Sequence, residues 1–338
     1  MPNKKDGFNS EVTFERISSL TQYQVTKKIG ARRGELAFSE AVELVVDITE
    51  YQSQLQSIGI PIPPIKELDV KYFPETEKAS IVLLTPWVGD DVESVMLSLN
   101  QNRDQKIIEW IIKEMCHIVL MACTKRTKDG ELSVGIDAKA NNFTVIIDNS
   151  GRRTMSYIDQ YPPRYWKNGV PIIEWIPLKS VLGKELGRFK YFDWRGVLLT
   201  LTSQLSRIKP LFKKQIENIA INEFKRRFEK SEFKKFNNEF IKLPWINFRN
   251  TLQKGDLNFA KQIIMQCVHE KVYGVRYSIY TLREIALELA MHGLISLDEL
   301  HKLFLDLHFE DEEFVSGRWK NIQEQLCRFT RHIYSVKE

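Results

Sequence analysis

Residues 135–145 read Gly-Ile-Asp-Ala-Lys-Ala-Asn-Asn-Phe-Thr-Val, and residues 157–159 read Tyr-Ile-Asp. A polar turn at residues 148–151 separates the two stretches. This pattern predicts a β-hairpin, in which a loop carrying Asp137 and Asn142 enters a strand at 143–147. The turn reverses the chain, and a second strand at 154–158 delivers Asp159 beside Asn142.

These side chains are the set that phosphoryl transfer from a nucleotide requires. One carboxylate orients the acceptor hydroxyl, while an amide and a second carboxylate hold magnesium. A lysine next to the first carboxylate can steady the transferred group. We therefore expect catalytic roles for Asp137 and Lys139, and Mg²⁺ ligands at Asn142 and Asp159. The alternative is an ordinary surface hairpin with polar turn residues.

The same stretch resembles the catalytic loop and metal-binding aspartate of the protein-kinase-like superfamily, nearest to the aminoglycoside and choline phosphotransferases. On this resemblance Asp137 matches the catalytic aspartate, Asn142 the magnesium asparagine and Asp159 the aspartate of the DFG position. Lys139 matches a lysine of eukaryotic-type serine/threonine kinases. The usual His-Arg-Asp or His-Gly-Asp is replaced by Gly-Ile-Asp at 135–137, and DFG by Asp-Gln-Tyr at 159–161. The resemblance is therefore to the superfamily and to no single family.

Composition is that of a soluble globular protein of 338 residues with a formal charge of +5. No apolar run approaches the roughly 20 residues of a membrane span, and the start lacks the apolar core of a signal peptide. The four cysteines form no Cys-x-x-Cys pair, and Cys116 and Cys123 are expected to be buried neutral thiols. We expect a cytoplasmic protein without a membrane partner. The mild positive charge permits an anionic partner without requiring one.

The resemblance implies an α+β, protein-kinase-like two-lobe fold. A small antiparallel sheet forms the N-lobe, and the C-lobe is mainly helical with a helical C-terminal extension. The expected divisions are a flexible N-terminus at 1–10, an N-lobe at 11–87, a C-lobe at 88–245 and a helical C-terminal part at 246–338. Periodicity predicts helices at 39–57 and 105–124, and strands at 12–17 and 23–29.

In such an N-lobe a lysine of the 23–29 strand holds the nucleotide phosphates, and Lys27 and Lys28 are the candidates. Alternation places only one of them on the nucleotide face. Lys28 is preferred, because this choice leaves Val25, Lys27 and Ile29 together on the other face.

The resemblance also implies an acid on the 39–57 helix that pairs with this lysine, and a main-chain contact to adenine. Glu43, Asp47 and Glu50 share one face of the helix, and their positions alone do not choose among them. Main-chain groups from Thr85 to Trp87 are expected at the adenine edge.

Residues 164–167, which follow Asp159, are Arg-Tyr-Trp-Lys, where an activation segment would lie. They could bind the acceptor, although prolines and aromatic residues also stiffen loops.

Our leading hypothesis is an ATP- and Mg²⁺-dependent kinase that phosphorylates a hydroxyl group. A proline-rich link at 58–64 and the lack of a glycine-rich loop favour a small-molecule acceptor slightly. Lys139 and the basic helices favour RNA or protein. One alternative is a pseudokinase that acts as a binding or scaffold protein. The other is an RNA-binding helical protein that uses the basic stretch 206–242, although interspersed glutamates favour a solvated amphipathic helix there. The oligomeric state is left open.

Overall fold

The computed structural model describes residues 4–6, 10–16, 23–30, 36–100, 102–148, 150–173, 187, 188, 190–231 and 234. The chain divides into two compact units, which take residues 1–98 with 140–165 (unit 1) and residues 99–139 with 166–338 (unit 2). The predicted boundaries of the two lobes stay predictions. The predicted helical part at 246–338 lies outside the described residues, as does most of the predicted N-terminal segment 1–10.

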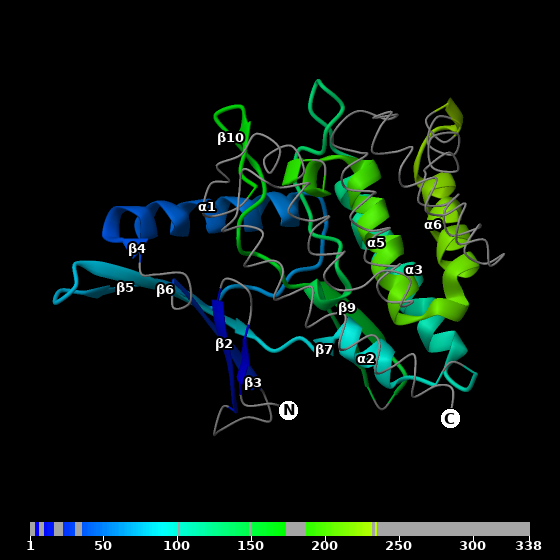
Figure 1. Ribbon diagram of the computed structural model, residues 1–338, viewed down its shortest axis with the longest axis horizontal. Coiled ribbons are helices and arrows are strands. Elements are labelled where there is room, and N and C mark those ends of the chain that lie inside the picture. The colour runs from blue at the N-terminus through cyan, green and yellow to red at the C-terminus, as the bar shows by residue number, and fades with distance from the viewer. Residues whose placement is uncertain are drawn as a thin grey trace, which may run out of the picture. The chain divides into compact units, whose positions relative to one another are not determined.

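Unit 1 contains an antiparallel sheet whose middle is formed by β2, β3 and β6 (Figure 1). β1 pairs with β2, while β4 and β5 both pair with β6. The bounds are β1 Lys4–Asp6, β2 Ser10–Arg16, β3 Tyr23–Ile29, β4 Leu36–Ala37, β5 Glu67–Phe73 and β6 Lys78–Pro86. In β6, Ala79, Ile81 and Leu83 are buried at the two-residue period of a strand. The predicted antiparallel sheet is confirmed.

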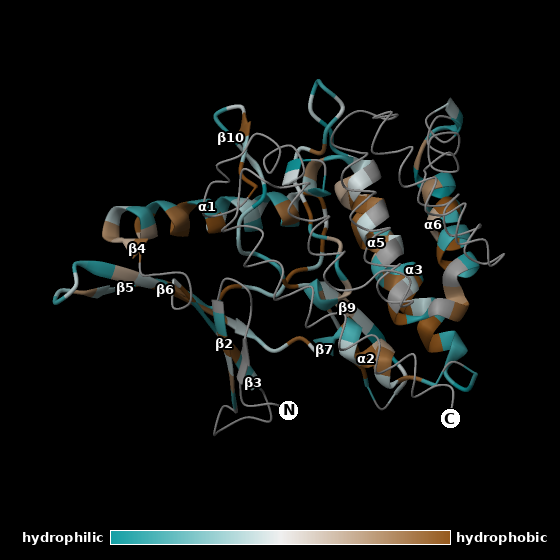
Figure 2. Cartoon of the chain, in the orientation of Figure 1, coloured by the Kyte–Doolittle hydropathy of each residue, from teal (hydrophilic) through white to brown (hydrophobic). Residues whose placement is uncertain are grey.

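Helix α1 (Phe38–Ser57) packs on β5 and β6 of this sheet. Its buried positions include Leu44, Ile48, Tyr51 and Leu55, which recur at the spacing of one helix face. Figure 2 shows the resulting alternation of hydrophobic and hydrophilic residues along α1. The helix begins one residue before the predicted start. Just past its C-terminal end lies Gly59, whose φ of 83° is the left-handed conformation common after helices.

The predicted hairpin forms the second sheet of unit 1. β8 (Phe143–Ile147) occupies the predicted positions, and β9 (Arg153–Tyr157) begins one residue early. The short β7 (Asp90–Asp91) pairs with β8, and helix α2 (Val92–Ser98) follows it. In the turn, the Asp148 carboxylate accepts bonds from the Ser150 hydroxyl and from the main-chain N–H groups of Ser150 and Arg152, which hold the pKa of this exposed acid below its usual value.

Unit 2 is mainly helical. Helices α3 (Gln105–Ala122), α5 (Trp194–Ile208) and α6 (Lys213–Arg227) contact one another (Figure 1). A two-stranded ribbon, β10 (Trp166–Lys167) with β11 (Val170–Pro171), completes its described strands. Cys116 and Cys123 are buried as predicted, and burial raises the pKa of both thiols, to about 12 for Cys123. The α+β class predicted from the sequence is therefore confirmed.

None of the helices among the described residues combines the length and apolar character needed to span a bilayer.

Candidate active site

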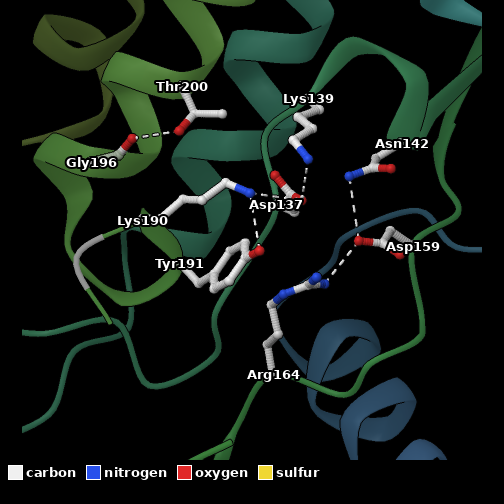
Figure 3. A network of polar contacts seen from close by, with 9 residues as sticks. All are labelled: Asp137, Lys139, Asn142, Asp159, Arg164, Lys190, Tyr191, Gly196 and Thr200. Atoms are coloured by element: carbon white, nitrogen blue, oxygen red, sulfur yellow. Dashed lines mark hydrogen bonds and ion pairs between the residues drawn. The ribbon is translucent and has the colours of Figure 1, made fainter. Parts of the chain in front are cut away.

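The hairpin of unit 1 brings Asn142 and Asp159 into contact (Figure 3). Asn142 ends the short 3₁₀ turn η1 (Ala140–Asn142), and Asp159 lies two residues after β9. The Asn142 side-chain amide lies 3.3 Å from Asp159 Oδ2, and the Ile158 N–H donates to the Asn142 carbonyl oxygen at 2.9 Å. The two predicted metal ligands are thus held together by the pairing of β8 with β9, the strands that lie between them in the sequence.

Lys27 is the strand lysine that reaches this pair. Its Nζ donates to the main-chain oxygen of Ile158 at 2.8 Å. Burial lowers the pKa of Lys27, and the nearby Asp159 carboxylate partly offsets this effect. Lys28 is exposed, so the geometry favours Lys27 over the preferred Lys28. By strand alternation Lys27 shares the face of the buried Ile29, and this face points inward.

Among the three candidate acids of α1, Asp47 is the one that points inward. It is 5% exposed and accepts a hydrogen bond from the Tyr165 hydroxyl at 2.7 Å. Glu43 and Glu50 are exposed, and Glu50 accepts a bond from the side-chain amide of Gln54. The inward acid therefore holds the segment that follows Asp159. Its predicted ion pair with a strand lysine stays a prediction.

The segment 160–165 is buried in unit 1, and acceptor binding by residues 164–167 stays a prediction. Arg164 is 3% exposed, and its Nη1 lies 2.8 Å from Asp159 Oδ2. The Gln160 side chain donates to the Pro63 carbonyl oxygen at 3.1 Å. Tyr51 of α1 lies close enough for the Arg164 charge to oppose the burial that raises the pKa of its hydroxyl. The sequence did not predict the contact between Arg164 and Asp159, because this contact depends on how the buried segment 160–165 folds.

Asp137 belongs to unit 2, where two lysines hold its carboxylate. Lys190 Nζ lies 3.2 Å and Lys139 Nζ 3.5 Å from Asp137 Oδ2. Asp137 and Lys190 are both buried, and Lys190 also donates to the Tyr191 hydroxyl at 3.0 Å (Figure 3). Lys139 was expected to steady the transferred group, and that role stays a prediction. Lys190 was missed, because it follows Asp137 by 53 residues and no local motif marks it.

Main-chain bonds fix the loop that carries Asp137. The Leu132 N–H donates to the Phe192 carbonyl oxygen at 2.8 Å, and the Ile136 N–H to that of Tyr191 at 3.1 Å. The indole N–H of Trp166 donates to the Leu132 carbonyl oxygen at 2.9 Å. Trp166, a predicted acceptor contact, thus helps to position the loop before Asp137.

The expected adenine contact lies at the end of β6. Thr85 is buried and faces Val25 across the sheet. The N–H of Trp87 donates to the Tyr23 carbonyl oxygen at 2.9 Å, and the two rings pack edge to face. This amide is therefore engaged within the sheet, and the adenine contact stays a prediction.

Asn142 and Asp159 of unit 1 are suitable ligands for a magnesium ion whose remaining ligands are phosphate and water oxygens. Mg²⁺ is usually held by one or two carboxylates, with phosphate and water oxygens completing its shell. Asp159 supplies a carboxylate, and Asn142 supplies an amide oxygen once the group is rotated, because the orientation of an amide follows its hydrogen bonds. The described residues contain no group of three His, Cys, Asp or Glu side chains placed to hold a metal without such oxygens.

No protein-family model matches the sequence, and no curated protein matches it. Among solved structures, the chain is similar to WaaP in complex with acyl carrier protein, with a TM-score of 0.43 and 9% identity, covering 78% of this chain and 89% of that one. It is also similar to the MAP kinase LmaMPK10 from Leishmania major, with a TM-score of 0.35 and 12% identity, covering 97% and 92%.

Proposed function

We propose that this chain is a phosphotransferase of the protein-kinase-like type, which uses ATP with Mg²⁺ to phosphorylate a hydroxyl group. The observation that carries the proposal is the convergence on Asp159 within unit 1. Asn142 contacts its carboxylate, and Lys27 binds the carbonyl group of the preceding residue, Ile158. A metal-binding pair beside an inward lysine is the combination that binding of nucleotide phosphates requires.

Each residue then has a defined task. Asn142 and Asp159 would hold magnesium, and a bound magnesium ion would neutralise negative charge on the phosphates. Lys27 binds phosphate oxygens. Asp137 orients the acceptor hydroxyl, and the ion pairs with Lys139 and Lys190 fix the position of its carboxylate. Asp137 and Asn142 lie five residues apart in one loop, which supports assigning them to the same reaction.

We propose a small hydroxyl compound as the acceptor. The described part of the basic stretch supports this choice over RNA, because its phenylalanines pack inward. Phe212 and Phe224 are buried, and Phe228 stacks on Phe224 with ring centroids 4.1 Å apart. Proteins that bind single-stranded RNA stack its bases on exposed aromatic rings, and buried rings are not available for this contact.

Thermal stabilisation by ATP, with and without MgCl₂, tests the nucleotide site. A ligand at 100 times its Kd should stabilise the fold by about 2.7 kcal/mol. We expect a magnesium-dependent shift in the wild type that Asp159→Asn loses. Asp69→Asn is the matched control, because Asp69 is an exposed aspartate of the same unit. No shift in the wild type would contradict the proposal, and equal shifts in both variants would contradict the assigned site.

One observation favours a second candidate, a pseudokinase that binds or scaffolds partners. The Arg164–Asp159 ion pair occupies the carboxylate that catalysis would use. Turnover separates the two candidates. For an active kinase we expect slow ATP hydrolysis without acceptor that Asp137→Asn abolishes while ATP still stabilises the fold. For a scaffold, ATP binding would occur without any hydrolysis above the level of this variant.

A further inference from the structure

The Asp159 carboxylate is surrounded by more positive charge than it can neutralise. Arg164 Nη1 lies 2.8 Å from its Oδ2 oxygen, and the Lys27 amine donates to the carbonyl oxygen of the preceding residue, Ile158. Arginine stays charged at any pH at which proteins fold. With Lys27 protonated, the three side chains together carry one net positive charge.

Arg164 is also fixed in place. Only 3% of its side chain is exposed, and the neighbouring Tyr165 is anchored to Asp47 of α1. The whole segment 160–165 is buried. Arg164 therefore acts on a ligand of Asp159 through its charge and its hold on that carboxylate, and does not swing away into solvent.

These charges discriminate between two forms in which a divalent cation can arrive. A free cation at Asp159 would meet a guanidinium group on the same carboxylate, and like charges repel more strongly in a partly buried site than in bulk water. A cation bound to a polyphosphate is part of an anionic complex. Lys27 and Arg164 attract such a complex, so the repulsion is offset.

We propose that Arg164 selects the ligand of this site: it excludes a free divalent cation from Asp159 and admits the cation only in complex with a polyphosphate. This inference depends on the proposed function, because it takes Asp159 as the metal-binding carboxylate. It assigns Arg164 as a specificity-determining residue that contacts the carboxylate and not the metal.

The test measures binding of Mn²⁺ by the loss of its free paramagnetic resonance signal, first alone and then with ATP or tripolyphosphate. Binding that remains in Asp159→Asn is subtracted. We expect the wild type to bind Mn²⁺ tightly only with a polyphosphate. Arg164→Gln should bind free Mn²⁺ about tenfold or more tighter than the wild type, because it removes the repelling charge. Arg164→Lys should behave like the wild type.

Arg103→Gln is the matched control, because the Arg103 side chain is 84% exposed and should leave Mn²⁺ binding unchanged. Equal affinity of wild type and Arg164→Gln for free Mn²⁺ would overturn the inference while leaving the function intact, provided that Mn²⁺ with ATP still binds. No binding of Mn²⁺ with ATP by any protein would overturn both. If Arg164→Gln does not fold, the wild type alone decides: equal affinity for Mn²⁺ with and without a polyphosphate refutes the selection, and much weaker binding of free Mn²⁺ supports it.

Discussion

Replacing Gly89 by alanine should destabilise unit 1 strongly, because no side chain fits at this position. Gly89 precedes β7 and has a φ of 113°. A Cβ atom there would lie 2.3 Å from the carbonyl oxygen and 2.6 Å from the carbonyl carbon of Val145 in β8. Both atoms belong to the backbone of a paired strand, so β8 itself would have to move.

The size of the effect follows from two contributions. Holding a residue other than glycine in a sparsely populated backbone region costs about 1–3 kcal/mol. Relieving an overpacked contact by a backbone shift costs about another 1–3 kcal/mol. Together they predict a loss of about 2–6 kcal/mol in the free energy of unfolding.

Gly151→Ala isolates the first contribution, the cost of the backbone conformation. Gly151 lies in the turn between β8 and β9 with a φ of 81°, and a Cβ there meets nothing within 4 Å. Urea unfolding should therefore show a loss of only about 1–3 kcal/mol for Gly151→Ala. Because β8 begins directly after Asn142 and pairs with β9, the strand before Asp159, Gly89→Ala should also weaken the stabilisation by Mg²⁺ and ATP. If the two variants lose equal stability and bind ATP equally, the reasoning about Gly89 fails.

Three further predictions concern single contacts. Lys27→Met should lose most of the thermal stabilisation by ATP, while Lys28→Met, a change in an exposed neighbour, should retain it; the reverse result would restore the preference for Lys28. Tyr165→Phe removes a buried hydrogen bond to the Asp47 carboxylate and should reduce the free energy of unfolding, measured in urea, by about 1.5–3 kcal/mol. In a chain that already carries Asp47→Ala, adding Tyr165→Phe should cost little more, because the acceptor of this bond is then absent. Burial and, secondarily, an arginine of α6 lower the pKa of His117, so the unfolded chain binds the proton first and stability falls as the pH drops below about 6.5. The melting temperature should fall less steeply below that pH in His117→Gln, and identical slopes would contradict this.

Local pattern was sufficient to predict the elements that carry the site. β3 and β8 have the predicted bounds, because alternation and the polar turn are properties of short segments. Helix α3 begins at the predicted Gln105 and ends two residues before the predicted end. Such elements are specified by periodicity and turn chemistry within about 20 residues.

What pattern did not reveal depends on partners far away in sequence. Lys27 and Lys28 occupy opposite faces, and only the Ile158 carbonyl group, 131 residues later, distinguishes them. The burial of Arg164 depends likewise on α1 and on Asp159. Lys190 contacts Asp137 although the two residues are 53 positions apart in the sequence. These contacts are set by tertiary packing, which a single sequence does not display.

The division of unit 1 into two segments determines how early this unit can fold while the chain is being synthesised. Residues 99–139 separate β7 from β8, its partner strand, so the sheet of β7, β8 and β9 cannot form when residue 98 has been made. Likewise, the hydrogen bonds that Asp47 and Pro63 accept cannot form until Tyr165 and Gln160 have been synthesised. In a nascent chain, the buried face of α1 therefore lacks part of its final packing and hydrogen bonding until residue 165 has left the ribosome. Joining residue 98 to residue 140 through a short linker would make unit 1 continuous and let it complete this core during synthesis.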